Sequence, residues 1–376
     1  GLLAYGLMRA AREARGRAHV FDAIFPLALL HPGHIQSMVW SSQILQVVPM
    51  VLAGGLLAGL LLAPRLNRPA SAAIAGLGVL ALSWAGGQGP FVALVLSIGF
   101  LVLAVARLRQ GASGWGPIWP ARLLAVASAA ALAGVGWQLR HSGPIDFARP
   151  VDRMARLAAS ALGPGGAAAG WPMALALVII AAAALTVALR RALWRGGDEA
   201  RHYRAVALVL AGTGVAIVAT GLGLLPLVDP GLANVAPSPF AEFSALGWCA
   251  GYLALGGLES GGTNRAARAM FWATVVILPF NTLEGLRWRS WYRDGTASVE
   301  RALVLETSAA TLAFGHQDFL GREWSVDDLA QRMGWLGRFG GPFSRLPEDD
   351  SALGPPAELP WDDAHVVRRQ IRFRSA

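Results

Sequence analysis

The chain has 376 residues, of which 55% are hydrophobic and 15% charged, and its formal net charge is +9. Its apolar residues gather into runs of about 17 to 25 residues with few charges, the length that crosses a hydrocarbon core, which indicates a polytopic membrane protein. All the basic residues are arginines. Because such residues serve a membrane protein first in orientation and lipid contact, we expect membrane lipids and no nucleic acid as partners. The single Cys249 excludes an internal disulfide framework.

The sequence predicts an all-α fold: a polytopic transmembrane helix bundle of about eight or nine spans, followed by a small, helical and partly irregular tail. The chain begins at Gly1 without a signal-peptide layout, so we expect residues 1–8 to end a helix and further spans to lie upstream. The apolar stretch 20–30 carries Asp22 and Pro26 and is too short to span alone. The clear spans are 43–63, 70–86, 90–106, 120–139, 171–189, 205–228, 240–258 and 269–286.

Arginines in short loops predict the side of the membrane that each loop occupies. The arginine-free loops 87–89 and 229–239 are expected outside. Because arginine-rich loops flank 20–63, residues 20–30 and their flanks must cross or re-enter the membrane, and the stretch 31–43 then faces outward. The loops expected in the cytoplasm contain Arg9, Arg12, Arg15 and Arg17; Arg65 and Arg68; Arg107, Arg109 and Arg122; Arg190, Arg191, Arg195, Arg201 and Arg204; and Arg265 and Arg268.

The predicted domains are a transmembrane bundle over 1–286 and an extramembrane tail over 287–376, which the same reasoning places outside. The arginines of "LRWRSWYRDG" conflict with that side. Either the aromatic residues Trp288, Trp291 and Tyr292 anchor an interfacial belt on the outer face, or one span is misassigned; we favour the belt.

Within the tail we expect one helix over 297–314 and a second over 325–334. Ser325 caps the second helix, with Asp328 three residues on as in a capping box, and Gly334 ends it. The proline-rich and acidic stretch that follows is expected to be an extended connector.

The loop 140–170 is expected on the outer face, with an amphipathic helix over 150–162. Val151, Met154 and Ala158 share one predicted face, and Asp152, Arg153 and Arg156 occupy the other. Such a helix either lies on the membrane surface, where it can hold an anionic lipid or a lipid-phosphate substrate, or packs on the bundle as a linker.

Ionisable and amide side chains at membrane depth are functional candidates, because they need a partner or water there. Asp22, Glu242, Asn281 and Glu284 meet this condition. Glu284 lies three residues before Arg287 on one helix face, which predicts a structural ion pair. Glu242 can lie at headgroup level without a special role.

The stretch "HPGHIQSMVWSSQ" at 31–43 interrupts the apolar runs with two histidines, two glutamines and a tryptophan. His31 and His34 flank Pro32 and Gly33, which favours a turn over a metal site, since no Cys or carboxylate accompanies them at ligand spacing. In the helix that follows, Gln36, Trp40 and Gln43 share one face. This stripe either lines a water-filled cleft for hydroxyl-rich ligands or makes hydrogen bonds between helices.

The segment "FPLALLHPGHIQSMVWSSQILQVVP" resembles a region of bacterial multi-pass glycosyltransferases of the GT-C-like type, in which a Pro- and Gly-containing turn leads through a Trp and a Gln into a span. The later "SPFAEFSALGW" is similar to the segment before a late span of those proteins. The likeness covers about 60 residues and the hydropathy plan of the rest. The chain departs from the pattern at Ser37, Met38 and Ser41, where the family favours acidic or amide residues and Gly.

The resemblance implies transfer of a sugar from a polyprenyl-phosphate donor to a cell-envelope acceptor, at the outer face of the bacterial inner (cytoplasmic) membrane. It implies an acid in the first extracytoplasmic loop as general base or metal partner, and a divalent cation as a candidate cofactor. That acid is expected upstream of Gly1, so no catalytic residue is assigned here. The implied cleft residues are His31, His34, Gln36, Trp40 and Gln43, and the implied donor-phosphate partners are Arg149, Arg153 and Arg156.

Two other functions fit the same residues. A transporter or flippase of a lipid-linked or polar solute would line its pathway with this stripe, and a structural membrane subunit would have no catalysis. Transport predicts helices broken near the midplane and internal symmetry. No inverted halves are visible in the sequence, which favours transfer.

Overall fold

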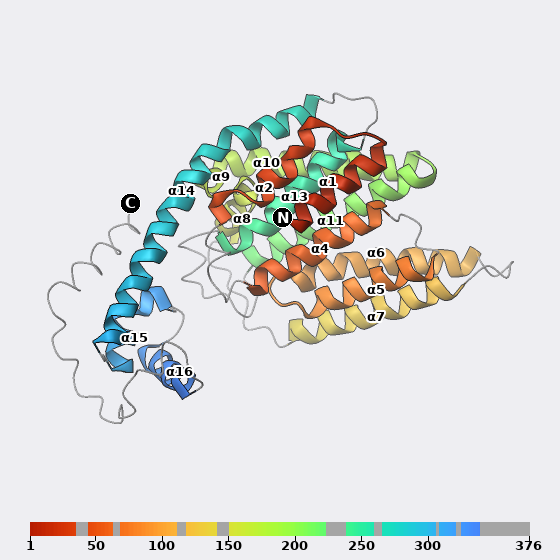
Figure 1. Cartoon of the computed structure of the whole chain (residues 1–376). Coiled ribbons are helices and arrows are strands. Elements are labelled where there is room, and N and C mark those ends of the chain that lie inside the picture. Colours follow the sequence, from red (N-terminus) through yellow and green to blue (C-terminus); the bar gives the residue numbers. More distant parts are fainter. Residues whose placement is uncertain are drawn as a thin grey trace. The chain divides into compact units, whose positions relative to one another are not determined.

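The computed structural model describes residues 1–34, 44–62, 68–110, 118–140, 150–222, 238–258, 265–305, 308–320 and 325–338. The contacts divide the chain into two compact units, Gly1–Gly285 and Leu286–Ala376. Every regular element in the described ranges is a helix and none is a strand (Figure 1), which confirms the predicted all-α fold.

The helices follow the chain in a simple order. The first unit contains α1 (Leu2–Arg15), η1 (Val20–Ala23), α2 (Ile24–Leu29), η2 (Pro32–His34), α4 (Ile44–Leu62), α5 (Pro69–Trp84), α6 (Gly89–Gln110), α7 (Trp119–Arg140), α8 (Pro150–Ala159), η5 (Ser160–Leu162), α9 (Pro164–Ala168), α10 (Gly170–Trp194), α11 (Gly197–Gly221), α13 (Ser238–Tyr252) and η6 (Leu253–Gly257). The helix α14 (Arg265–Val304) begins in the first unit and ends in the second, which also contains α15 (Ala309–Leu320) and α16 (Val326–Arg338).

Several helices are long and apolar enough to cross a membrane. The described residues contain 5 such helices. Three further predicted spans correspond to shorter apolar helices, Val47–Leu62, Pro69–Trp84 and Phe243–Gly256. The long ones are Gly89–Arg109, Trp119–Arg140, Gly170–Trp194, Gly197–Gly221 and Arg265–Val304. These helices support a membrane protein, and the number of eight or nine crossings stays a prediction.

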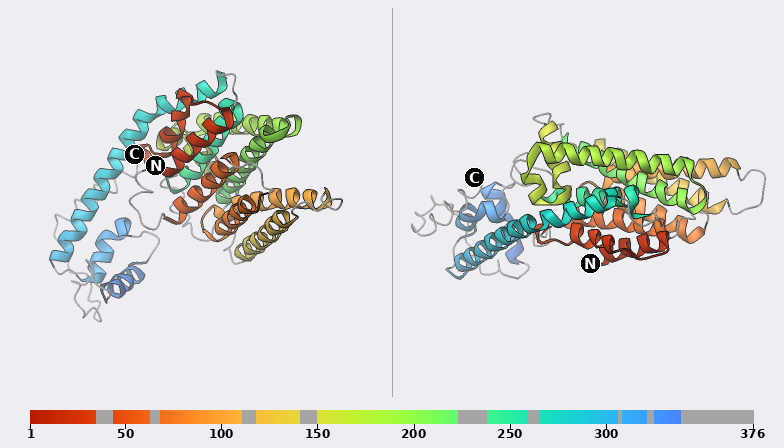
Figure 2. Two further views of the ribbon diagram at one scale, coloured as in Figure 1. Left: turned by 45° about the vertical axis from the view of Figure 1, so that its right-hand side comes forward. Right: turned by 90° about the horizontal axis from the view of Figure 1, so that it is seen from above.

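The distribution of side-chain size on α10 is that of a lipid-facing helix. Its buried positions are mostly alanines, such as Ala184 and Ala188, whereas the large side chains of Leu175, Val178 and Ile179 are exposed. Small residues allow close helix packing inside a membrane, where lipid solvates the large apolar ones. The helices α5, α6 and α7 also pack side by side (Figures 1 and 2), with Gly76 of α5 against Ala127 of α7.

The segment 20–34 runs beside the first half of α14. At one end the rings of Phe21 and Phe271 lie 5.1 Å apart, and at the other the Pro32 carbonyl meets Gly285. The 14 helical residues between Phe271 and Gly285 span about 21 Å. The crossing or re-entry of residues 20–30 and their flanks stays a prediction.

The second unit differs from the prediction in its helix boundaries. The expected helix over 297–314 is wrong, because α14 continues unbroken to Val304 and α15 begins at Ala309. Val299 and Leu303 of α14 pack with Leu312 and Leu329, and this packing keeps the end of α14 helical. The predicted Ser325 cap is confirmed by its bonds with Asp328, but the helix continues past Gly334 to Arg338.

The amphipathic helix predicted in the loop 140–170 is present as α8, with a different buried face. Val151 was expected on the apolar face but is 57% exposed, whereas Ala155 and Leu157 are buried together with Ala158. The helix packs against α10 and α11, and Met154 fills the space beside Gly221. Within the described residues α8 is therefore packed on the bundle, as in the linker interpretation.

Candidate functional site

The HPGH sequence folds into a compact turn directly after α2. The backbone N–H of Gly33 donates to Nδ1 of His31 (3.1 Å), and Nε2 of His34 donates to the carbonyl of Ala28 (3.0 Å). The two imidazole rings stack with centroids 4.0 Å apart. Because a carbonyl can only accept, the bond to Ala28 places a proton on Nε2 of His34 and leaves its Nδ1 as an acceptor in the neutral ring.

A glycine-rich loop and α14 close over this turn. Gly163 has a positive φ of 84°, which favours glycine, and a Cβ there would meet Cε1 of His31 at 2.6 Å and Nδ2 of Asn281 at 2.7 Å. The Asn281 amide donates to the Leu162 carbonyl (2.7 Å) and accepts from the N–H of Gly165 (2.8 Å). We call residues 31–34, 162–166, Asn281 and Gly285 the turn junction.

Both histidines of the turn junction are buried and neutral. The exposed fraction is 4% for His31 and 3% for His34. Burial, and then the neighbouring His34, lowers the pKa of His31 to about 3, and burial also lowers the pKa of His34 against the opposing bond to Ala28. This differs from the expected water-filled cleft lined by these rings, because in the described residues they hold the turn.

The other predicted site residues fall into two groups. Gln36, Trp40, Gln43 and Arg149 lie outside the described residues. Arg153 is half-buried and Arg156 is exposed on α8, whose C-terminal end passes through η5 into the turn junction. The structure therefore brings the two histidines to the loop that follows the arginine-bearing helix.

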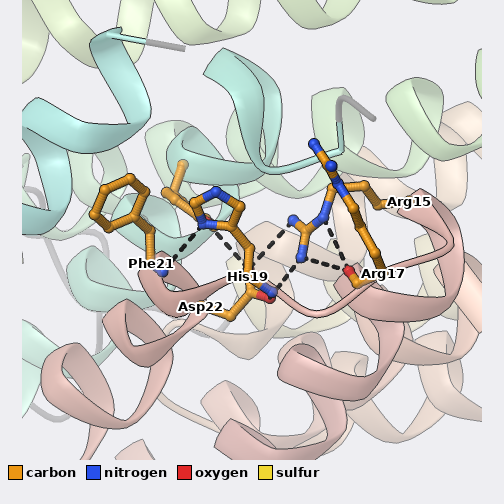
Figure 3. Close-up of polar contacts among 6 residues, drawn as sticks. Arg15, Arg17, His19, Phe21 and Asp22 are labelled. Atoms are coloured by element: carbon orange, nitrogen blue, oxygen red, sulfur yellow. Dashed lines mark hydrogen bonds and ion pairs between the residues drawn. The ribbon is translucent and has the colours of Figure 1, made fainter. Parts of the chain in front are cut away.

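Among the polar candidates, Asn281 finds its hydrogen-bond partners in the turn junction, and Asp22 finds its partners in a second cluster. Asp22 pairs with Arg15, with 2.5 Å between Oδ2 and the guanidinium, and accepts from the hydroxyl of Tyr252 (3.0 Å). Figure 3 shows Arg15 reaching across the chain turn to Asp22, with Arg17 and His19 beside them. Arg15 also donates to the Arg17 carbonyl. We call Arg15, Arg17, Asp22 and Tyr252 the buried ion-pair cluster.

The buried ion-pair cluster lies next to an irregular helix. Tyr252 is the last residue of α13, and η6 directly after it is a π-helical turn. The Ala254 carbonyl of that turn accepts from Arg191 (3.4 Å), which also donates to the hydroxyl of Tyr203 (2.6 Å). Two arginine–tyrosine arrangements thus flank a helix type that often occurs at functional sites.

Sequence reasoning identified Asp22 but not its partners. Tyr252 is 230 residues away in the chain, and only the fold reveals that contact. The sequence indicated only that Asp22 needs a partner, because a carboxylate in an apolar stretch requires a hydrogen-bond donor or a cation. Glu284 and Arg287 each make contacts in the structure, and the side chain of Glu242 lies outside the described residues.

Comparisons with protein-family models, with curated proteins and with solved structures find no match to this chain. The described residues also contain no group of three or more His, Cys, Asp or Glu side chains that could hold a metal ion. The divalent cation that the family resemblance implies therefore has no ligand set in these ranges, and we assign no step to it.

The close approach at Gly285 generates a stability prediction. A Cβ there would lie 2.3 Å from the Pro32 carbonyl oxygen, a backbone atom that cannot rotate away. We expect Gly285→Ala to lower the thermal midpoint in detergent, because overpacking typically costs about 1–3 kcal/mol and outweighs the helical gain of about 0.5–1 kcal/mol. The control is Gly55→Ala, where no described atom lies within 4 Å, and it should not destabilise. Equal behaviour of the two variants would contradict the contact.

The neutral histidines generate a pH prediction. Their folded pKa values lie below the unfolded value of about 6.5, so the unfolded state binds more protons and stability falls as the pH drops below 6.5, down to about 3 for His31. Each histidine contributes a slope of up to about 1.4 kcal/mol per pH unit. Thermal midpoints measured from pH 7.5 downward should fall less steeply for His31→Gln than for the parent protein. An unchanged slope in His31→Gln would refute the assignment.

The buried ion-pair cluster generates a mutational prediction. Asp22→Ala leaves the Arg15 charge buried without its carboxylate, which typically costs about 3–5 kcal/mol. Arg15→Met combined with Asp22→Leu should be less destabilising than Asp22→Ala alone, because it removes both charges. The readout is thermal unfolding in detergent. As a matched hydroxyl control, Tyr5→Phe at an exposed tyrosine should change nothing, whereas Tyr252→Phe should destabilise. A double variant no better than Asp22→Ala would show that the pair is not electrostatically coupled.

Proposed function

We propose that this chain is an integral membrane glycosyltransferase-like protein that transfers a sugar from a polyprenyl-phosphate donor to a cell-envelope acceptor. The proposal places it in the bacterial cytoplasmic membrane, with its site at the outer face. Its support is the likeness of residues 25–49 and 238–248 to GT-C-like enzymes, together with the membrane-spanning length of several helices.

One observation carries the proposal to particular residues: the ring of His31 packs against Gly163. The turn at 31–34 leads directly into the polar stretch with Gln36, Trp40 and Gln43. Gly163 follows the helix with Arg153 and Arg156. The turn junction therefore joins the start of the first candidate segment to the end of the second.

In this proposal the two kinds of residue have different roles. His31 and His34 are positioning residues, since both are buried, His31 bonds the backbone of its own turn and His34 bonds the Ala28 carbonyl of α2. The amides and the indole of the polar stretch suit a sugar, because they offer hydrogen bonds and an apolar ring face. Guanidinium groups bind phosphate bidentately, which suits Arg149, Arg153 and Arg156 to the donor phosphate.

A transporter or flippase is the second candidate, and the buried ion-pair cluster favours it. Ionisable groups inside a membrane protein commonly mark a substrate or ion pathway. The Arg15–Asp22 pair lies beside the π-helical turn η6, and transporter sites often use interrupted helices. If the chain is a transporter, substitution of Asp22 rather than of the polar stretch should abolish its function.

A membrane-fraction assay tests the transferase proposal and separates it from the second candidate. Membranes from cells that express the chain in its full-length context are supplied with radiolabelled polyprenyl-phosphate sugars, and sugar incorporation is measured. Removal of one binding hydrogen bond is expected to lower turnover about tenfold in Gln43→Ala, and a similar loss is expected in Arg153→Gln. Arg190→Gln, an exposed arginine on α10, is the matched charge control and should retain full turnover.

The outcomes are distinct. Unchanged turnover in both Gln43→Ala and His31→Ala would refute the assigned site. Loss of lipid-linked sugar movement across proteoliposomes in Asp22→Asn, with no transfer activity in the parent protein, would favour the transporter instead.

A further inference from the structure

We propose that Arg107, Arg201 and Arg204 form a binding site for a phosphate-bearing anion at one end of the paired helices α6 and α11. We call these residues the arginine triad. The site is separate from the turn junction and independent of the proposed transferase function.

The register of the two helices places the triad together. Gln88 donates to Thr220, Val92 packs against Gly212, and Gly99 packs against Leu208, so α6 and α11 run antiparallel. Continuing this register for eight residues beyond Gly99, roughly two turns, brings Arg107 opposite the first turns of α11. Arg201 and Arg204 lie there, three residues apart and therefore on one helix face.

The charges of the triad are only partly balanced by protein. Arg201 pairs with Asp198, and the nearby Glu199 is 3.7 Å from Arg195. In the parts of the chain that the structure describes, no carboxylate forms an ion pair with Arg107 or Arg204. The antiparallel register places Arg201 and Arg204 opposite Arg107 on the facing helix. Three guanidinium groups thus face one carboxylate, which leaves a net positive charge between two helices.

Burial makes this arrangement specific. Arg107 and Arg201 are half-buried, and Nε of Arg201 is buried without a hydrogen-bond partner among the described residues. Like charges held together with reduced solvation repel one another, and a bound anion removes that repulsion. The N–H on Nε of Arg201 has no acceptor in the described residues, and an oxygen of the anion would supply one.

The location and the donor chemistry identify the ligand class. Guanidinium groups recognise phosphate oxygens bidentately. The triad lies at the ends of two candidate spans, and its loops are among those predicted to be cytoplasmic. Basic pockets between spans on that side bind the head groups of anionic lipids, and a free phosphate offers the same oxygens.

The experiment uses the full chain in phosphatidylcholine nanodiscs. Short-chain phosphatidylglycerol is titrated in one arm and inorganic phosphate in the other, and binding is followed by the thermal midpoint. The triad variant is Arg107→Gln with Arg204→Gln. Each arginine near a headgroup contributes about a fivefold gain in affinity, so the triad variant, which lacks two, should bind the anion roughly 30-fold more weakly than the parent. The control, Arg190→Gln with Arg265→Gln, removes two exposed arginines predicted on the same side and should weaken binding less than about threefold.

Each outcome decides the proposal. Selective loss of phosphatidylglycerol binding in the triad variant supports a lipid headgroup site, and selective loss of phosphate binding supports a site for a free anion. No binding of either probe, or equal weakening in both variants, overturns the proposal. In neutral lipid the triad variant should be at least as stable as the parent, since repulsion is removed. A clear drop there would show that the arginines serve folding, and would also overturn it.

Discussion

A polar group that enters a hydrocarbon core must find its partner inside the protein, and this constraint organises the described structure. The Asp22 carboxylate pairs with Arg15 and accepts hydrogen bonds from the His19 N–H and the Tyr252 hydroxyl. Asn281 meets it by bonding the backbone on both sides of the loop at Gly163. In each case a polar side chain ties together segments that are distant in the chain, so the same contacts that satisfy polarity also fix the packing.

Packing by small residues permits those contacts. The turn junction depends on glycine at 163 and 285, because a Cβ at either position would overlap His31 or the Pro32 carbonyl. On α10 most of the buried residues are alanines, whereas Leu175, Val178 and Ile179 are exposed. Lipid tails solvate large apolar side chains as well as the protein interior does, so burying them inside the bundle gains little. Close backbone approach is therefore the main source of specificity between such helices.

The sequence was sufficient for what depends on local pattern and insufficient for what depends on distant contacts. Apolar runs predicted the all-α fold, and the Ser325 cap was predicted from a capping box. The helix predicted over 297–314 was wrong in its bounds, because α14 runs without a break to Val304, where Val299 and Leu303 pack with Leu312 of the separate helix α15. The buried face of α8 was misjudged because its neighbours cover Ala155 and Leu157, which no periodicity along α8 alone reveals.

The candidate site was predictable to the same limited extent. The HPGH residues indicated a turn, and the structure contains one, but the burial of both rings follows from the loop at 162–166 and from α14. Burial changes the chemistry that these histidines can perform, since a buried, stacked imidazole that bonds the backbone through Nδ1 of His31 or Nε2 of His34 holds geometry rather than transferring protons. Any ligand chemistry at this end then belongs to the polar stretch that the turn introduces, and the histidines determine where that stretch begins.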